Sequence, residues 1–222
     1  MRLASRIVRR SNFREAEICL SGMIEEFGGR VATVWSELRP STRGLVERAL
    51  QAAGGGTQPA RNFHYDARAD LELSRFLTAL DDRALEKNHA LDSEAIKNLK
   101  SVADACAEVL QQKTESAEVF AQLVRRAQAQ RAYNRIDVLA DSLTARFPPS
   151  EICELARSGD VIVRELANEA LARFPVSVLA TLLNDPVDSE IARAALRRQV
   201  VEYGSEDARH IVNVLDQVMS DE

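Results

Sequence analysis

The chain has 222 residues, and its 45% apolar residues are enough for a buried core. Aromatic residues make up only 5%, and no run of β-branched and aromatic residues alternates over several positions, which excludes a β-sheet protein and predicts an all-α fold. The formal charge is −5, and no apolar stretch reaches the roughly 18 residues of a membrane-spanning helix, so we expect no membrane span.

The beginning of the chain is basic, whereas its end is acidic. Residues 1–53 carry nine basic and six acidic side chains, and residues 133–222 carry nine basic and sixteen acidic ones. A candidate basic patch precedes the first acidic residue: Arg2, Arg6, Arg9, Arg10 and Arg14. Such a patch could attract a phosphate-bearing partner, but we prefer the interpretation of a solvated, basic helix end.

An N-terminal helical region is predicted over residues 1–53. Apolar residues recur at helical spacing in three stretches: residues 13–27, 31–38 and 45–52. Gly28 and Gly29 offer a stop after the first stretch, because glycine tolerates a positive φ, and Pro40 ends the second. Residues 54–65 contain three consecutive glycines and a proline, so we predict a linker there.

A helical repeat domain is predicted over residues 66–222. Apolar spacing indicates four further helices besides the repeats: residues 71–80, 94–113, 119–127 and 205–219. Asp81 and Asp82 are expected to close the first, Asp92 and Ser93 to cap the second, and Thr114 or Ser116 to open the third. The last helix, capped by Ser205, would cover the end of the domain.

The three cysteines, Cys19, Cys106 and Cys153, are odd in number, and each lies in an apolar helical pattern. Buried, reduced thiols are therefore expected, which is typical of a cytoplasmic protein.

The strongest signal in the chain is an internal repeat. LADSLTARFP, from Leu139 to Pro148, matches LANEALARFP, from Leu166 to Pro175; both begin with Leu-Ala and end with Ala-Arg-Phe-Pro. Each is followed by a short apolar stretch, which Ser150 or Ser177 could cap, and then by an Asp-containing turn and another helix. The repeated unit predicts stacked pairs of helices.

Two segments carry a family resemblance: ELARSGDVIVRELANEAL and TLLNDPVDSEIARAALRR. They resemble HEAT-like repeats of the short leucine-rich-variant or PBS-lyase type, over about residues 118–200. The matching positions are Asp160, Val163, Arg164, Leu166, Ala167 and Leu171, followed by Asp185, Ile191, Ala192 and Leu196. Ser189 and Asp137 stand where the pattern has a basic residue. The resemblance implies an α-solenoid, in which small residues such as Ala167 and Ala192 let neighbouring helices approach closely.

A non-enzymatic protein-protein interaction scaffold or adaptor is the function that this architecture favours. Solenoids expose equivalent positions of successive helices as one continuous surface. The candidate interaction surface consists of polar residues at such positions: Asp141, Glu165, Asn168, Glu190 and Arg193. A protein or peptide partner is expected, and its identity stays open.

Other functions remain as alternatives. A HEAT-like nucleic-acid-binding protein or DNA glycosylase has a similar size and repeat type, but it needs a basic surface, and the repeat region is acidic. A lyase or chaperone-like subunit acting on a chromophore follows only from the PBS-lyase likeness. A homodimer, in which the basic N-terminus of one copy docks on the acidic repeats of another, is compatible with the scaffold.

No catalytic, cofactor-binding or metal site is predicted. The three consecutive glycines lack the Lys-Ser/Thr of a phosphate loop. Glu86 with His89, and Asp207 with His210, have the spacing of carboxylate-bridged metal sites, but exposed polar residues are the better interpretation of both pairs.

Overall fold

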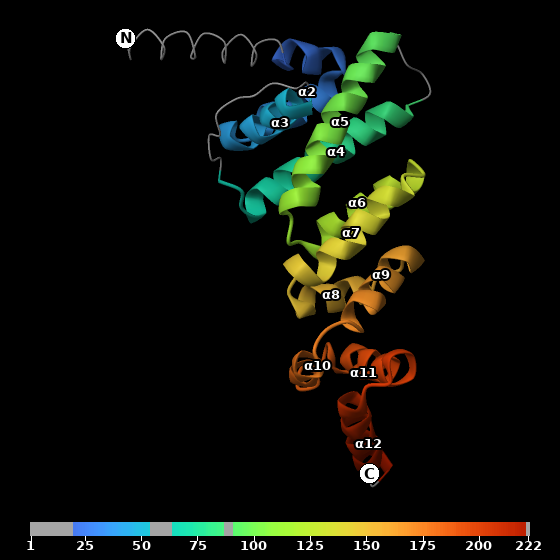
Figure 1. The fold of residues 1–222 in the computed structure, drawn as a ribbon. Helices are drawn as coiled ribbons and strands as arrows, with labels where there is room; N and C mark the ends of the chain where they lie inside the picture. The colour runs from blue at the N-terminus through green and yellow to red at the C-terminus, as the bar shows by residue number, and fades with distance from the viewer. Residues whose placement is uncertain (1–19, 54–63, 87–90, 221–222) are drawn as a thin grey trace, which may run out of the picture. The chain divides into compact units, whose positions relative to one another are not determined.

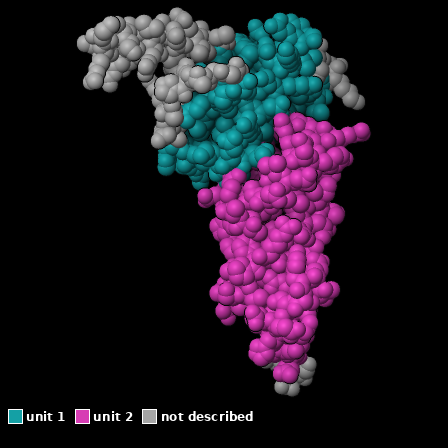
Figure 2. Space-filling view, viewed as in Figure 1, with its two compact units in different colours: residues 1–114 teal, residues 115–222 magenta. Residues whose placement is uncertain are grey.

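The computed structural model describes residues 20–53, 64–86 and 91–220, except for the side chains of 218–220. All regular secondary structure in these ranges is helical, which confirms the predicted all-α class (Figure 1). None of the described helices is long and apolar enough to cross a bilayer. The chain forms two compact units, residues 1–114 and 115–222 (Figure 2).

In unit 1, residues 20–26 are helical, followed by α2 (Gly29–Glu37), α3 (Pro40–Ala53), α4 (Ala67–Leu85) and α5 (Ser93–Lys113). Gly28 separates the first helical stretch from α2 with a φ of 110°, as the glycine signal predicted. Arg83 of α4 donates from Nε to the carbonyl oxygen of Phe27 at 2.7 Å, so a long-range contact caps this helix end.

Two helix boundaries in unit 1 follow from local chemistry. Asp66 and Asp92 are the N-caps of α4 and α5, and each side chain accepts a hydrogen bond from the backbone three residues later. The predicted end of α4 at Asp81 and Asp82 is wrong, because both lie inside a helix that runs on to Leu85. Asp82 instead forms an exposed ion pair with Arg30 at 2.9 Å.

The core of unit 1 lies between α2, α4 and α5. Trp35 packs against Phe76 with ring centroids 5.1 Å apart, and both side chains are buried. Leu99 and Cys106 contribute from α5. Because α3 packs on α5 and α4, the helices on both sides of residues 54–63 belong to the same unit.

This division differs from the predicted one. The linker was placed at residues 54–65, whereas the compact units divide at residue 114. Most of the predicted linker, residues 54–63, lies outside the described residues. Packing between α3 and α5 depends on residues far apart in the sequence, and local composition does not report it.

Unit 2 consists of seven helices: α6 (Ala117–Ala129), α7 (Tyr133–Arg146), α8 (Pro149–Ala156), α9 (Val161–Leu171), α10 (Val176–Leu182), α11 (Ser189–Tyr203) and α12 (Glu206–Ser220). The helices pack as pairs, α6 with α7, α8 with α9, and α10 with α11. Successive pairs contact each other through α6 and α8, α7 and α9, and α9 and α11, and α12 packs on α10 and α11 (Figure 1).

Side-chain caps begin three of these helices. Ser116 caps α6, and the Ser205 hydroxyl accepts from the backbone of Ala208 at the start of α12, as expected. Asp160 caps α9. The expected caps at Ser150 and Ser177 are wrong, since both lie inside their helices. Pro148 and Pro175 occupy the N-cap positions there, and no side chain makes a cap hydrogen bond.

Small residues lie at the buried positions of the repeated helices. Ala167 and Ala170 of α9, and Ala192 and Ala195 of α11, are all at most 5% exposed. Phe120 and Phe147 pack edge to face with centroids 5.3 Å apart. Small side chains at these buried positions leave room for neighbouring helices to approach closely.

Candidate interaction surface

The five predicted surface residues lie on α7, α9 and α11, which alternate in the sequence with the shorter helices α8 and α10. Asp141 belongs to α7, Glu165 and Asn168 to α9, and Glu190 and Arg193 to α11. The three carboxylates are exposed, whereas Asn168 and Arg193 are half-buried. Because α7 contacts α9 and α9 contacts α11, the exposed carboxylates mark one row of neighbouring helices.

Arg193 differs from the others in its surroundings. Only 16% of its side chain is exposed, and Nη1 forms an ion pair with Glu190 at 3.2 Å. Substitution of Arg193 would therefore disturb packing as well as surface charge. A test of this surface is better made on Asp141, Glu165 and Glu190.

An ion-pair network that sequence reasoning missed joins α9 to α11. The Glu169 carboxylate accepts from Arg173 at 2.8 Å and from Arg198 at 2.9 Å, and Arg198 also pairs with Glu202 at 2.8 Å. The hydrogen bond to Glu202 is the main cause that raises the pKa of Arg198, and the charges of Glu169 and Glu165 add to it. The i, i+4 spacings are visible in the sequence, but the link between the helices is not.

Gln199 is a second connection between these helices. Its side chain is 6% exposed and donates to two backbone carbonyls, of Ala172 at 3.1 Å and of Phe174 at 2.6 Å. These carbonyls belong to the residues just after α9, where backbone acceptors lose their helical partners. Gln199 thus fixes the end of α9 against α11, and no local signal pointed to it.

A third connection joins the end of α8 to the start of α11. Nη1 of Arg157 lies 2.6 Å from Oδ1 of Asp188, whose side chain is 6% exposed, and 3.4 Å from the carbonyl oxygen of Val187. Cys153 of α8 is buried nearby, and burial, with a smaller contribution from the Asp188 charge, raises the pKa of its thiol to about 12. A buried thiol with a raised pKa is a poor nucleophile at neutral pH.

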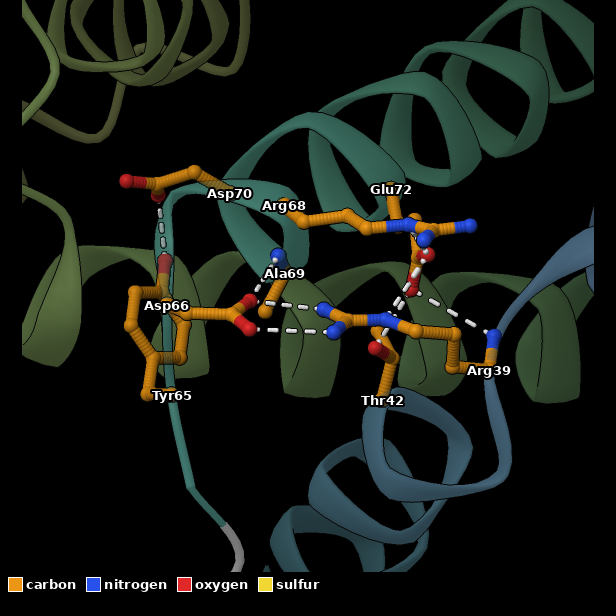
Figure 3. A network of polar contacts seen from close by, with 8 residues as sticks. All are labelled: Arg39, Thr42, Tyr65, Asp66, Arg68, Ala69, Asp70 and Glu72. Carbon is orange, nitrogen blue, oxygen red and sulfur yellow. Dashed lines mark hydrogen bonds and ion pairs between the residues drawn. The ribbon is translucent and has the colours of Figure 1, made fainter.

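Unit 1 contains its own polar network, centred on Arg39 between α2 and α3 (Figure 3). Its guanidinium donates to both carboxylate oxygens of Asp66, at 2.6 and 3.0 Å, and from Nε to Glu72 at 3.0 Å. Glu72 also accepts from Thr42 at 2.5 Å and Arg68 at 3.1 Å. The network ties the α2–α3 junction to the first turns of α4.

Both carboxylates in this network are held in the ionised form. The hydrogen bonds from Arg39 and from the Ala69 backbone lower the pKa of Asp66. Burial opposes ionisation of Glu72, but hydrogen bonds from Thr42 and Arg39 outweigh it and lower its pKa. Carboxylates that stay ionised and fully engaged are poor general acids, so the arrangement suits a structural clamp.

The remaining predicted positions add no further site. The basic patch of Arg2, Arg6, Arg9, Arg10 and Arg14, together with Cys19 and His89, lies outside the described residues. Asp207 and His210 are both exposed on α12. Within the described ranges, no group of three or more His, Cys, Asp or Glu side chains could hold a metal ion.

Comparison of the chain with models of protein families, with curated proteins and with solved structures found no match.

Proposed function

We propose that unit 2 is a short α-solenoid of HEAT-like repeats, and that the protein is a non-enzymatic interaction scaffold which binds a protein or peptide. The repeated sequence motif supports this proposal, because LADSLTARFP falls at the end of α7 and LANEALARFP at the end of α9. Each is followed by a short helix after its proline, α8 and α10, and then by a longer helix.

One observation carries the proposed binding surface. The helices α7, α9 and α11 are successive neighbours, and each exposes an acidic side chain while burying small or apolar ones. The fold therefore repeats a constant buried face and leaves the polar face free to vary, which is the property that solenoids use for recognition. Exposed carboxylates at Asp141, Glu165 and Glu190 favour a partner that carries basic groups there.

The test is a triple substitution of these carboxylates, Asp141→Asn, Glu165→Gln and Glu190→Gln, in the full chain. Affinity capture from nuclease-treated lysate, followed by mass spectrometry, identifies a retained protein, and its purified form is then titrated against each variant. We expect the triple variant to lose at least tenfold in affinity, which corresponds to about 1.4 kcal/mol.

The matched control changes three exposed acidic residues on other helices, Glu118→Gln on α6, Glu154→Gln on α8 and Asp207→Asn on α12. It alters the net charge by the same amount and should leave the affinity unchanged. Equal affinities of both triple variants and the unmodified protein would refute the proposed surface, provided that all three have the same helical circular dichroism and melting temperature.

A further inference from the structure

The turn between α6 and α7 has an unusual residue at its centre. Arg131 has a φ of 55°, and it is the one non-glycine residue with a positive φ in the described parts of the chain. The backbone N–H of Arg131 donates to Gln128 at 2.9 Å, and that of Ala132 donates to Ala127 at 2.8 Å. This pair of hydrogen bonds ends helices in a left-handed residue, and glycine is the usual choice because a Cβ is disfavoured there.

The chain uses glycine for the equivalent role elsewhere. Gly204 follows α11 with a φ of 63°, in the left-handed region. An arginine at position 131 therefore carries a conformational cost that a glycine would remove. Its side chain is exposed and forms no ion pair or hydrogen bond with any described residue, so no such side-chain interaction offsets that cost.

The surroundings of Arg131 are basic in a unit that is otherwise acidic. Residues 119–136 contain Arg125, Arg126, Arg131 and Arg135 and no acidic residue, whereas the rest of residues 115–222 has eight basic and eighteen acidic side chains. Tyr133 begins α7 and is 65% exposed. We name this surface, made by Arg125, Arg131 and Tyr133, the basic turn.

We propose that the basic turn binds a carboxylate-rich segment of a partner protein, at a site that does not include Asp141, Glu165 or Glu190. Arginine and tyrosine are the side chains that most often dominate protein interfaces, since they combine a polar group with a large contact area. The guanidinium of Arg131 pairs with a carboxylate, and the Tyr133 ring covers the adjacent apolar part of the segment.

The charge distribution favours a carboxylate segment over a nucleic acid. Glu118 on α6 and Asp137 and Asp141 on α7 are exposed at either side of the basic turn in the sequence. A long polyanion would pass these charges and the acidic remainder of the unit, which costs electrostatic energy. A short acidic segment can contact Arg125 and Arg131 without crossing the acidic remainder of the unit.

The experiment uses a fluorescein-labelled polyglutamate peptide that is short enough to cover the basic turn alone, and measures its binding to the full-length protein by anisotropy at low and at physiological salt. Two substitutions separate the side chain from the backbone: Arg131→Gly removes the guanidinium and the strain, and Arg131→Ala removes the guanidinium alone. We expect both to weaken binding about tenfold, which corresponds to about 1.4 kcal/mol. Only Arg131→Gly should also raise the melting temperature, so loss of binding cannot come from misfolding.

The control variant is Arg209→Ala on α12, which removes one partly exposed arginine that pairs with Glu206. It changes the net charge by the same amount and should bind polyglutamate like the unmodified protein. Equal losses in Arg209→Ala and Arg131→Ala would overturn the proposal, because binding would then follow net charge. Tighter, Arg131-dependent binding of a single-stranded oligonucleotide than of polyglutamate would also overturn it and assign the basic turn to nucleic acid.

Discussion

Arg157 and Asp188 offer the sharpest test of how unit 2 is held together. Asp188 is almost fully buried at the start of α11, and Arg157, just after α8, is the cation paired with it. Replacement of Arg157 by alanine would leave a buried carboxylate without its counter-charge. A further replacement of Asp188 by asparagine in the same chain would remove that charge, because the asparagine side chain has nearly the same shape but is neutral.

The size of the effect follows from the burial of the two partners. Removal of one member of a fully buried pair costs about 3–5 kcal/mol, because the other charge stays desolvated. The Arg157 side chain is 40% exposed, so water reaches part of the site and reduces the penalty. We therefore expect Arg157→Ala to lower the free energy of unfolding by about 2–3 kcal/mol, and the double variant with Asp188→Asn to recover about half of that loss.

Urea unfolding followed by far-ultraviolet circular dichroism measures this change. Trp35 is the only tryptophan of the chain and lies buried in unit 1, so its fluorescence follows the unfolding of unit 1, which contains neither substitution. A loss of less than about 0.5 kcal/mol for Arg157→Ala would refute the reasoning, since surface substitutions commonly have effects of that size. So would a double variant less stable than the single one.

The remaining predictions concern pH, thiol reactivity and a buried amide. Because the pKa of Glu72 is lowered, its contribution to stability is present above the ordinary value of 4.5 and is lost as the pH falls through the lowered pKa. Arg39→Met should therefore flatten the acid side of a plot of melting temperature against pH, recorded by tryptophan fluorescence. An unchanged slope would contradict the structural clamp. In a Cys19→Ser variant, a thiol reagent at pH 8 should react slowly with Cys106 and Cys153 of the native protein, because both thiols are buried. Both should react rapidly after denaturation. Fast reaction of the native protein would show that one of the two thiols is accessible. Gln199→Ala should lower the free energy of unfolding, measured by chemical denaturation, by about 2 kcal/mol, because two backbone carbonyls lose their hydrogen-bond donor. A loss within the error of that measurement would show that Gln199 does not stabilise the packing of α9 against α11.

Local chemistry made the helices of this chain predictable. Asp92 and Ser116 combine a capping side chain with apolar residues at helical spacing, and both caps are confirmed. Ser150 and Ser177 are not caps, because Pro148 and Pro175 hold the N-cap positions and each serine is the second residue of its helix. Asp81 was taken for a helix end, although a polar residue on a half-buried helix face is no obstacle to further turns.

Long-range contacts explain what the sequence did not reveal. The unit boundary depends on α3 packing against α5, and Gln199 reaches carbonyls of residues 172 and 174. Helical spacing placed the five candidate surface residues on α7, α9 and α11, but it did not show that Arg193 would be mostly covered. A pattern records which face of a helix is apolar, whereas burial at the edge of that face depends on the neighbouring helix.

The pairwise stacking of unit 2 has a consequence for how it opens. Since the main contacts of α12 are with α10 and α11, its detachment leaves the packing among α6, α7, α8 and α9 largely intact. Amide hydrogens should therefore exchange fastest in α12 and progressively more slowly toward α8 and α9, because local unfolding begins at the C-terminal end of the unit. The Glu169–Arg198 ion pair and the Gln199 hydrogen bonds lie at the step from α11 to α9, where this progression should pause.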